Sequence, residues 1–352
     1  MDYKSTLAKF ILCVISCFSV MIYGCFSFLC AADRFTSSSE ENIKEEAAST
    51  SVTNIKVPQS SSSSENSASL KSETQKESES KAVPAAAKSD AIGEITEKFI
   101  SPYTAKTSYK NIYVKNSTEL NIDIKSLYEQ KLNFKIEKNN EPQVLIMHTH
   151  TTESFLPESR DFYTSSDRSR TTDESKNMVA LGNIVTDKLN NAGIKTLHDK
   201  TAHDYPSYNE SYTRASKTIL SYLKKYPSIK IVIDMHRDAI SPSDTQKVKL
   251  TTEINGKKAA QIMLVMGSQS GNVKNFPNWQ ENLKLALKLQ ENLETKYPSL
   301  ARSLSLMSRN YNESLSTGSM LIEIGTDANS LEEVKYSAEL LGNSLSDLLK
   351  KI

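Results

Sequence analysis

The stretch Val144-Leu145-Ile146-Met147-His148-Thr149-His150-Thr151-Thr152-Glu153 decides the fold. An apolar run, typical of a buried strand, is followed by histidines, threonines and a glutamate. A second apolar run, Ile229 to Ile233, ends in the same way, in Asp234-Met235-His236-Arg237-Asp238. Strand ends at one edge of an α/β sheet converge in space, and ligands bind at that edge. The two runs therefore predict one site built from histidine and carboxylate side chains that lie far apart in the sequence.

Histidine and cysteine are distributed unevenly. The chain has five histidines, all between His148 and His236, which is the clustering expected of a zinc enzyme. The chain also has four cysteines, all near the N-terminus: Cys13, Cys17, Cys25 and Cys30. The rest of the chain can therefore form neither a disulfide framework nor a thiolate metal site. Any metal there must be held by histidine, carboxylate and water.

Strand and helix signals alternate along the C-terminal two thirds of the chain. This rhythm predicts an α/β fold with a mostly parallel or mixed central sheet and helices on both faces. The predicted strands are 143–148, 194–198, 229–235, 247–254, 261–266 and 320–324. The predicted helices are 175–191, 208–225, 278–296 and 330–351. Gly193 follows the first of these helices, where a left-handed C-cap is wanted.

The N-terminus has the pattern of a membrane anchor. Phe10 to Ala32 carries no charge, and at ~1.5 Å per residue such a run crosses a ~30 Å hydrocarbon core. Lys4 and Lys9 precede it, which predicts a cytoplasmic N-terminus and an extracytoplasmic remainder. A cleaved signal peptide is the alternative, although its apolar region is usually shorter.

The rest of the chain divides by composition. We expect a cytoplasmic stub and anchor over 1–34, a disordered Ser/Glu/Lys-rich linker over 35–93, an N-terminal extension over 94–141 and a catalytic domain over 142–352. The linker composition cannot bury enough apolar surface to fold. The net charge is +1, so bulk electrostatics favours no nucleic-acid partner.

Two histidines are the first candidates for metal ligands. A catalytic zinc needs about three protein ligands and an open position for water. His150 and His236 each follow a strand and lie beside acids, which favours a shared ion over two unrelated caps of the sheet edge. Two carboxylates compete for the third position: Glu174, near the start of the next helix, and Glu153, three residues after His150. Interaction with the helix dipole explains Glu174 equally well.

A further carboxylate is needed as general base, and Glu323 is the candidate. It lies within the apolar strand Ser319-Met320-Leu321-Ile322-Glu323-Ile324-Gly325, where an ionised group is costly unless it is paired or functional. Asp234 and Asp238 flank His236 and are expected to orient it. His148 shares one side of an extended segment with His150, as a further ligand or as a second contact around the ion.

Two polar stretches resemble the walls of a substrate groove. The first contains His203, Tyr208 and Asn209, and the second contains Arg309. Amide, hydroxyl and aromatic groups suit a sugar–peptide polymer better than a small apolar ligand. Ordinary polar surface loops are the alternative for both stretches.

Several blocks together resemble the stage II sporulation protein P family, in order and in spacing. They cover the chain from about Glu141 to its end. The blocks are His148-Thr149-His150-Thr151-Thr152-Glu153-Ser154-Phe155-Leu156-Pro157, His203-Asp204-Tyr205-Pro206-Ser207-Tyr208-Asn209-Glu210-Ser211-Tyr212, Asp234-Met235-His236-Arg237-Asp238-Ala239, Tyr311-Asn312-Glu313-Ser314-Leu315-Ser316-Thr317-Gly318-Ser319 and Leu321-Ile322-Glu323-Ile324-Gly325.

The resemblance implies a sporulation peptidoglycan hydrolase whose catalytic domain is similar to zinc-dependent N-acetylmuramoyl-L-alanine amidases. It implies zinc on His150 and His236, a third ligand at Glu174 and catalysis by Glu323. The chain has His-Thr-His-Thr-Thr-Glu where the amidases have Gly-His-Gly-Gly, and this keeps Glu153 as the alternative ligand.

The resemblance also implies a second activity and several partners. The second activity is endopeptidase cleavage of peptide cross-links. The implied partners are peptidoglycan, stage II sporulation protein D (a lytic transglycosylase) and stage II sporulation protein M, during engulfment. Two other functions stay open at this point: a non-catalytic cell-wall-binding module, and another zinc hydrolase on the same scaffold.

Overall fold

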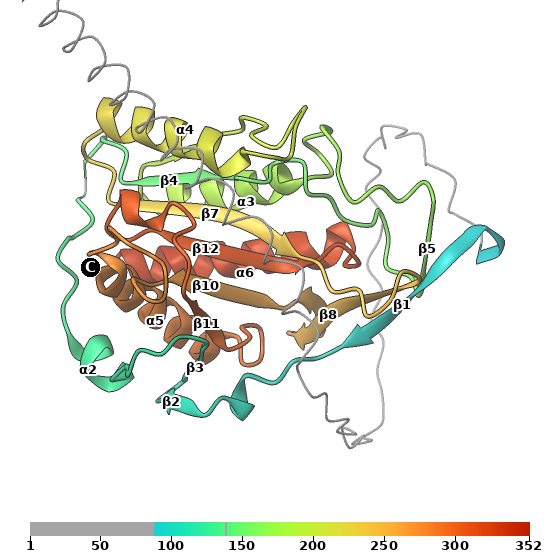
Figure 1. Ribbon diagram of the computed structural model, residues 1–352, viewed down its shortest axis with the longest axis horizontal. Helices are drawn as coiled ribbons and strands as arrows, with labels where there is room; N and C mark the ends of the chain where they lie inside the picture. The colour runs from blue at the N-terminus through green and yellow to red at the C-terminus, as the bar shows by residue number, and fades with distance from the viewer. Residues whose placement is uncertain (1–87, 138) are drawn as a thin grey trace, which may run out of the picture. The chain divides into compact units, whose positions relative to one another are not determined.

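The computed structural model describes residues 88–137 and 139–352, drawn in colour in Figure 1. The predicted anchor and nearly all of the predicted linker lie outside this part. Within it, no helix combines the length and the apolar character needed to cross a bilayer.

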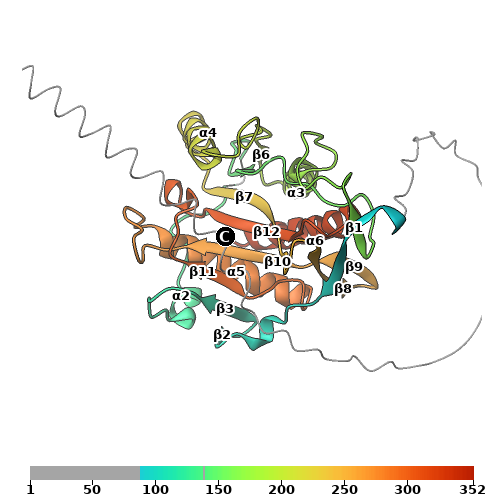
Figure 2. The same cartoon turned by 45° about the vertical axis from the view of Figure 1, so that its right-hand side comes forward.

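An eight-stranded mixed sheet forms the centre of the fold. Figure 2 shows β7, β12, β10 and β11 side by side in that spatial order, with α2 beside the β2–β3 edge. Strands β6, β4, β7 and β12 run parallel to one another, and β10 is antiparallel to β12. In spatial order the strands are β2 (Thr107–Tyr109), β3 (Ile112–Asn116), β11 (Leu304–Met307), β10 (Ile262–Gly267), β12 (Met320–Thr326), β7 (Ile231–Asp238), β4 (Val144–Met147) and β6 (Thr196–His198).

Helices cover both faces of this sheet, as the sequence predicts. Alternate residues of β4 take part in different cores: Val144 and Ile146 pack with α3 (Met178–Asn191), α5 (Trp279–Lys296) and α6 (Leu331–Leu349). Leu145 and Met147 pack instead with α4 (Ser211–Lys225). A strand buried on both faces needs apolar side chains at every position, which explains its uninterrupted run.

Residues before β4 extend this sheet. β3 pairs with β11 in parallel, β2 forms a hairpin with β3, and α2 (Ile124–Glu129) packs against α5. The predicted N-terminal extension thus shares the core of the predicted catalytic domain. Its alternating residues Ile112 and Val114 face that core.

A second, four-stranded sheet has the order β5 (Phe162–Thr164), β1 (Ala91–Lys98), β8 (Gln246–Ile254) and β9 (Lys257–Ala260). The turn between β8 and β9 is Asn255-Gly256, and both residues have positive φ, 51° and 74°. Asparagine and glycine are the residues that a two-residue hairpin turn of this kind requires. β12 contacts β8, which places this sheet at the carboxyl end of β12.

Capping residues set the ends of α3 and the start of α6. α3 begins at Met178, three residues later than predicted, because Asn177 is its N-cap and accepts a hydrogen bond from the Val179 amide. Gly193 follows the helix with a φ of 82°, as predicted. α6 begins with a capping box between Ser330 and Glu333.

Candidate functional site

Strand β7 places three polar side chains on one face of the main sheet. Asp234, His236 and Asp238 alternate along it, and they share the face of Val232, which packs beneath α4. On the neighbouring parallel strand β12, Glu323 lies directly opposite His236. The predicted base and the second predicted histidine are therefore brought together by strand register.

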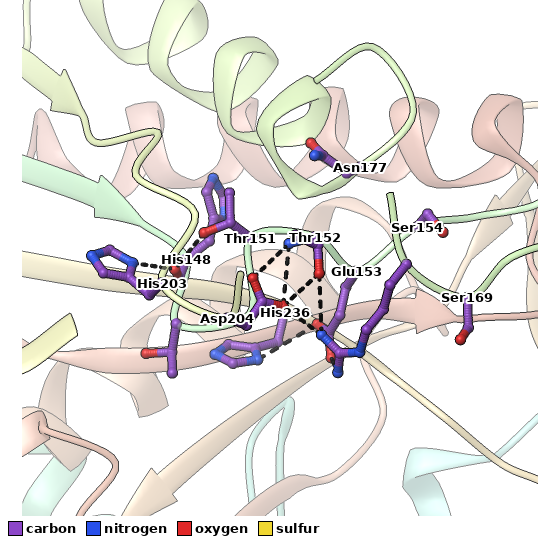
Figure 3. Close-up of polar contacts among 12 residues, drawn as sticks. His148, Thr151, Thr152, Glu153, Ser154, Ser169, Asn177, His203, Asp204 and His236 are labelled. Carbon is purple, nitrogen blue, oxygen red and sulfur yellow. Dashed lines mark hydrogen bonds and ion pairs between the residues drawn. The ribbon is translucent and has the colours of Figure 1, made fainter. Parts of the chain in front are cut away.

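The turn after β4 brings two more candidates to the same place. The rings of His150 and His236 lie 5.2 Å apart and almost perpendicular. The Glu153 carboxylate has Oε2 3.6 Å from Nδ1 of His236, and Oε2 also accepts a hydrogen bond from the Arg237 amide at 3.2 Å. Figure 3 shows Glu153 beside His236, with Thr152 and Asp204 adjoining them.

Three side-chain atoms of this group are buried without a hydrogen bond, and one of them, Nε2 of His236, has the charged Asp234 at 2.9 Å instead; the other two have no such partner. These two are Nδ1 of His150 and Oε2 of Glu323. Burying such a group without a partner costs free energy, so each is a position at which a ligand would be favourable.

The electrostatics of the group favour a bound cation. Burial lowers the pKa of His236, but Asp234, Glu153 and Glu323 raise it to about 10 overall. Burial and the neighbouring charge of His236 lower the pKa of His150 to about 2. Burial and Asp238 raise the pKa of Glu323 to about 8, although His236 opposes them. Three carboxyl groups thus gather around His236, and a proton holds the positive charge there when no ion is bound. A bound cation would replace that proton, while His150 is already neutral and able to bind a metal.

Asp234 has the orienting position that the sequence predicts. Its Oδ1 lies 2.9 Å from Nε2 of His236, in an ion pair. Its two oxygens also accept hydrogen bonds from the amide and the hydroxyl of Thr149, at 2.8 and 2.6 Å. The carboxylate therefore links the turn after β4 to β7 and leaves Nδ1 of His236 facing Glu153.

Asp238 does not orient His236, contrary to prediction. Its Oδ2 accepts a hydrogen bond from the Arg302 guanidinium at 2.9 Å. Arg302 stands just before β11, across the sheet from β7. Asp238 and Arg302 instead influence Glu323, whose pKa the first raises and the second lowers.

The preference for Glu174 as third ligand is also corrected. Its side chain is 58% exposed and its charged partner is Lys200, at 3.7 Å. Because α3 begins at Met178, Glu174 lies in the turn before the helix and not in its first turn. The carboxylate that joins the histidines is the alternative, Glu153, whose side chain is 8% exposed.

His203 and His148 are interior groups. His203, predicted to bind substrate, donates from Nδ1 to the His148 carbonyl at 2.8 Å and accepts at Nε2 from Thr218 at 2.9 Å. His148 donates from Nδ1 to the Met235 carbonyl at 3.0 Å, and its Nε2 accepts from Nε2 of His198 at 2.8 Å. His148 is thus no ligand; it fixes the backbone next to His236.

The remaining predicted residues take different positions. The ring of Tyr208 stacks on His150 at 4.6 Å and is 45% exposed, so it forms part of the wall of the site. Asn209 is exposed, and its carbonyl accepts a hydrogen bond from Arg214. Arg309 donates to the carbonyl of its neighbour Ser308. Neither of these bonds joins Asn209 or Arg309 to the two histidines.

Sequence reasoning missed three contributors to the site: Arg170, Asp204 and Tyr212. The Tyr212 ring is perpendicular to His150 at 5.6 Å and nearly parallel to His236 at 6.4 Å. Burial raises the pKa of its phenol well above the usual value, so it stays neutral. Asp204 and Tyr212 lie in a block already noted for its polar groups, but Arg170 stands in a polar loop that carries no signal of its own.

These side chains approach one another without forming a closed metal cage. Among residues 88–137 and 139–352, no set of three or more His, Cys, Asp or Glu side chains is arranged to hold a metal ion. The predicted zinc therefore stays a prediction.

Fold and site define an α/β protein with a buried imidazole–carboxylate centre on one face of a mixed sheet. The chain belongs to the stage II sporulation protein P family, because the model of that family (SpoIIP) matches residues 27–346. The stage II sporulation protein P of Bacillus subtilis (strain 168) is 31% identical over 220 residues, 58% of this chain and 50% of that protein. The chain thus spans about half the length of the curated relative it matches.

Solved structures of N-acetylmuramoyl-L-alanine amidases overlap part of the chain. The amidase from Clostridium difficile 630 is 15% identical and covers 60% of this chain and 97% of its own, with a TM-score of 0.35. Ami1 from Mycobacterium smegmatis is 12% identical and covers 61% and 100%, with a TM-score of 0.34. The CwlD amidase from Clostridioides difficile, solved with the GerS lipoprotein, is 13% identical and covers 59% and 97%, with a TM-score of 0.35.

Proposed function

We propose that the chain is a zinc-dependent peptidoglycan hydrolase, an N-acetylmuramoyl-L-alanine amidase that also cuts peptide cross-links. One observation carries the proposal: Glu153 Oε2 and His236 Nδ1 face each other at 3.6 Å, beside the unpartnered Nδ1 of His150 and the buried Oε2 of Glu323. Family membership supports a role in sporulation. The choice of peptidoglycan as substrate follows the motifs that this chain shares with the family.

The donor atoms present are of the kinds that zinc binds, namely two imidazole nitrogens and a carboxylate oxygen. Two donors that bind one tetrahedral zinc at ~2.0–2.1 Å are about 3.3 Å apart, close to the separation of the Glu153 and His236 donors. His150 would be the third ligand, since burial and nearby positive charge keep its ring neutral. When bound there, zinc would polarise the scissile carbonyl and lower the pKa of water toward ~7.

The chain's own groups would carry the proton and the substrate. Glu323, beside His236, would take the proton of the attacking water and deliver it to the leaving amine. Asp234 would hold His236 in place through Nε2. Tyr208, exposed beside His150, would contact the sugar–peptide junction. Arg309 is proposed to bind another part of the substrate.

We also propose where the protein acts. Phe10 to Ala32 would anchor it in the membrane with its C-terminal domain outside the cytoplasm. Stage II sporulation proteins D and M would act with it during engulfment. A glycan-cutting enzyme and an amidase together would degrade the wall more completely than either alone.

The test is amide cleavage by the full chain in detergent, with zinc, on purified peptidoglycan. Cleavage of the muramic acid–alanine bond exposes a new alanine amine, which amine labelling and mass spectrometry of the products detect. We expect release by the wild type and none above background by Glu323→Gln. The proposal is wrong if zinc-loaded wild type binds the wall but leaves this bond intact.

A further inference from the structure

We propose that Arg170 is a positioning residue that fixes two of the proposed metal ligands at once, Glu153 directly and His150 through Tyr208. The inference rests on the proposed function, because it concerns the ligands of the proposed zinc.

The backbone places Arg170 opposite Glu153. The Thr171 amide donates to the Thr152 carbonyl at 2.7 Å, and the Ser154 amide donates to the Ser169 carbonyl at 3.1 Å. These two bonds flank the antiparallel bridge between Glu153 and Arg170. Residues opposite each other between such bonds form a non-hydrogen-bonded pair, whose side chains lie close together on the same side. The contact between the two side chains is thus built into the chain path.

The Arg170 guanidinium is anchored independently of Glu153. Its Nη1 donates to Asp204, whose side chain has no exposed surface. Asp204 is itself fixed, because it accepts hydrogen bonds from the amide and the hydroxyl of Thr152. The other terminal nitrogen, Nη2, lies 3.6 Å from Oε1 of Glu153. A planar guanidinium with one end anchored can direct its other end at a fixed point.

Arg170 also reaches the first histidine. Its guanidinium lies over the Tyr208 ring at 4.7 Å, and that ring stacks on His150 at 4.6 Å with an interplanar angle of 15°. Guanidinium, phenol ring and imidazole therefore form one connected group. These contacts limit rotation of the His150 ring, whose Nδ1 has no hydrogen bond to orient it.

Loss of the guanidinium would therefore loosen both ligands without removing either. Glu153 would keep the hydrogen bond of Oε2 with the Arg237 amide, and His150 would keep its edge contact with Tyr212. We expect weaker zinc binding and an altered coordination geometry, with the fold retained.

The experiment measures zinc affinity of the full chain in detergent by competition with a chromophoric chelator. Arg170→Gln should bind zinc about 10- to 100-fold more weakly than wild type, the range seen when groups that orient metal ligands are removed. The matched control is Arg168→Gln, an exposed arginine of the same loop, which should bind as wild type does. Arg170→Lys keeps the charge but not the planar fork, and should fall between them.

A spectroscopic signature separates positioning from a general loss of stability. With Co²⁺ in place of zinc, the visible bands of Arg170→Gln should change in position or intensity, while its melting temperature without metal stays near that of wild type. If Arg170→Gln does not fold, Arg170→Lys decides the question by the same two measurements.

Several results would overturn the inference. Wild-type zinc binding with unchanged affinity and spectrum in Arg170→Gln would refute positioning and leave the proposed function standing. Tighter binding by that variant would show that the guanidinium competes with the ion. If the wild type binds no zinc, the proposed function and this inference fail together.

Discussion

Glu323 and His236 lie directly opposite each other on the parallel strands β12 and β7, with their side chains on the same face of the sheet. The pairing brings a buried carboxyl without a partner for Oε2 against a histidine whose pKa its acidic neighbours raise to about 10. Strand register holds the Glu323 carboxyl group rigidly in place, because neither backbone can shift without breaking the ladder.

Replacing Glu323 with glutamine tests its role as base. The change keeps the shape but removes the proton acceptor, so turnover of peptidoglycan should fall by about 10²- to 10⁴-fold. Zinc content and wall affinity should be unchanged. A variant that retains more than a tenth of wild-type turnover would show that another group accepts the proton.

Replacing Asp234 with asparagine tests the support of His236. The amide side chain of Asp234→Asn can still accept from Thr149 but cannot hold the imidazole by charge, so zinc affinity should fall about 10- to 100-fold. Asp238→Asn is the matched control, since it makes the same change on the same strand at a residue that pairs with Arg302. Equal losses in the two variants would mean that overall charge, and not contact with His236, sets the affinity.

The sequence predicted the strands that carry the site and missed several short strands. The middle residues of β4, β7 and β12 form apolar runs because both faces of these strands are covered, by helices or by the side chains of the site. β5 and β11 are short and mix polar with apolar residues, and β9 is half exposed, so periodicity gave no signal for them. β9 could have been found from the turn Asn255-Gly256.

The contact pair of buried His148 and half-buried His198 makes stability depend on pH. Burial lowers the pKa of His198 to about 3 and that of His148 to about 4, from 6.5. Below pH 6.5 the unfolded chain therefore binds protons that the folded chain does not, and stability falls as the pH drops toward these values. The slope is up to about 1.4 kcal/mol per pH unit for each histidine.

His198→Gln isolates one member of the pair. The glutamine amide can still donate to His148, but it does not titrate. In urea unfolding of metal-free protein, the wild type should lose more stability than the variant between about pH 7 and about pH 5. This range includes the ordinary histidine pKa of about 6.5. Parallel stability curves would show that His198 is not held neutral in the folded chain.

The carboxylate of the site could not be chosen from sequence. Glu174 was preferred because the helix was predicted to begin at residue 175. It begins at Met178, which leaves Glu174 in the preceding turn with its side chain exposed. Arg170 was invisible for a related reason. Its position follows from two backbone hydrogen bonds between loops, which no local pattern encodes.

Gly182 is where α3 passes the same histidine pair. Alanine in place of a glycine in a helix usually gains up to about 1 kcal/mol. Here the new Cβ would lie 2.4 Å from Nε2 of His198 and 2.7 Å from Nε2 of His148. Gly182→Ala should therefore lower the melting temperature, and the loss should shrink in a His198→Ala background. An increase in melting temperature would show that the two rings are not held against the helix.

Zinc content tests the central claim, that His150 and His236 bind the same ion. Elemental analysis of the purified full chain should find one zinc per wild-type molecule and far less in both His150→Ala and His236→Ala, while His198→Gln keeps its metal. If both alanine variants fold and still hold one tightly bound zinc each, the account is wrong.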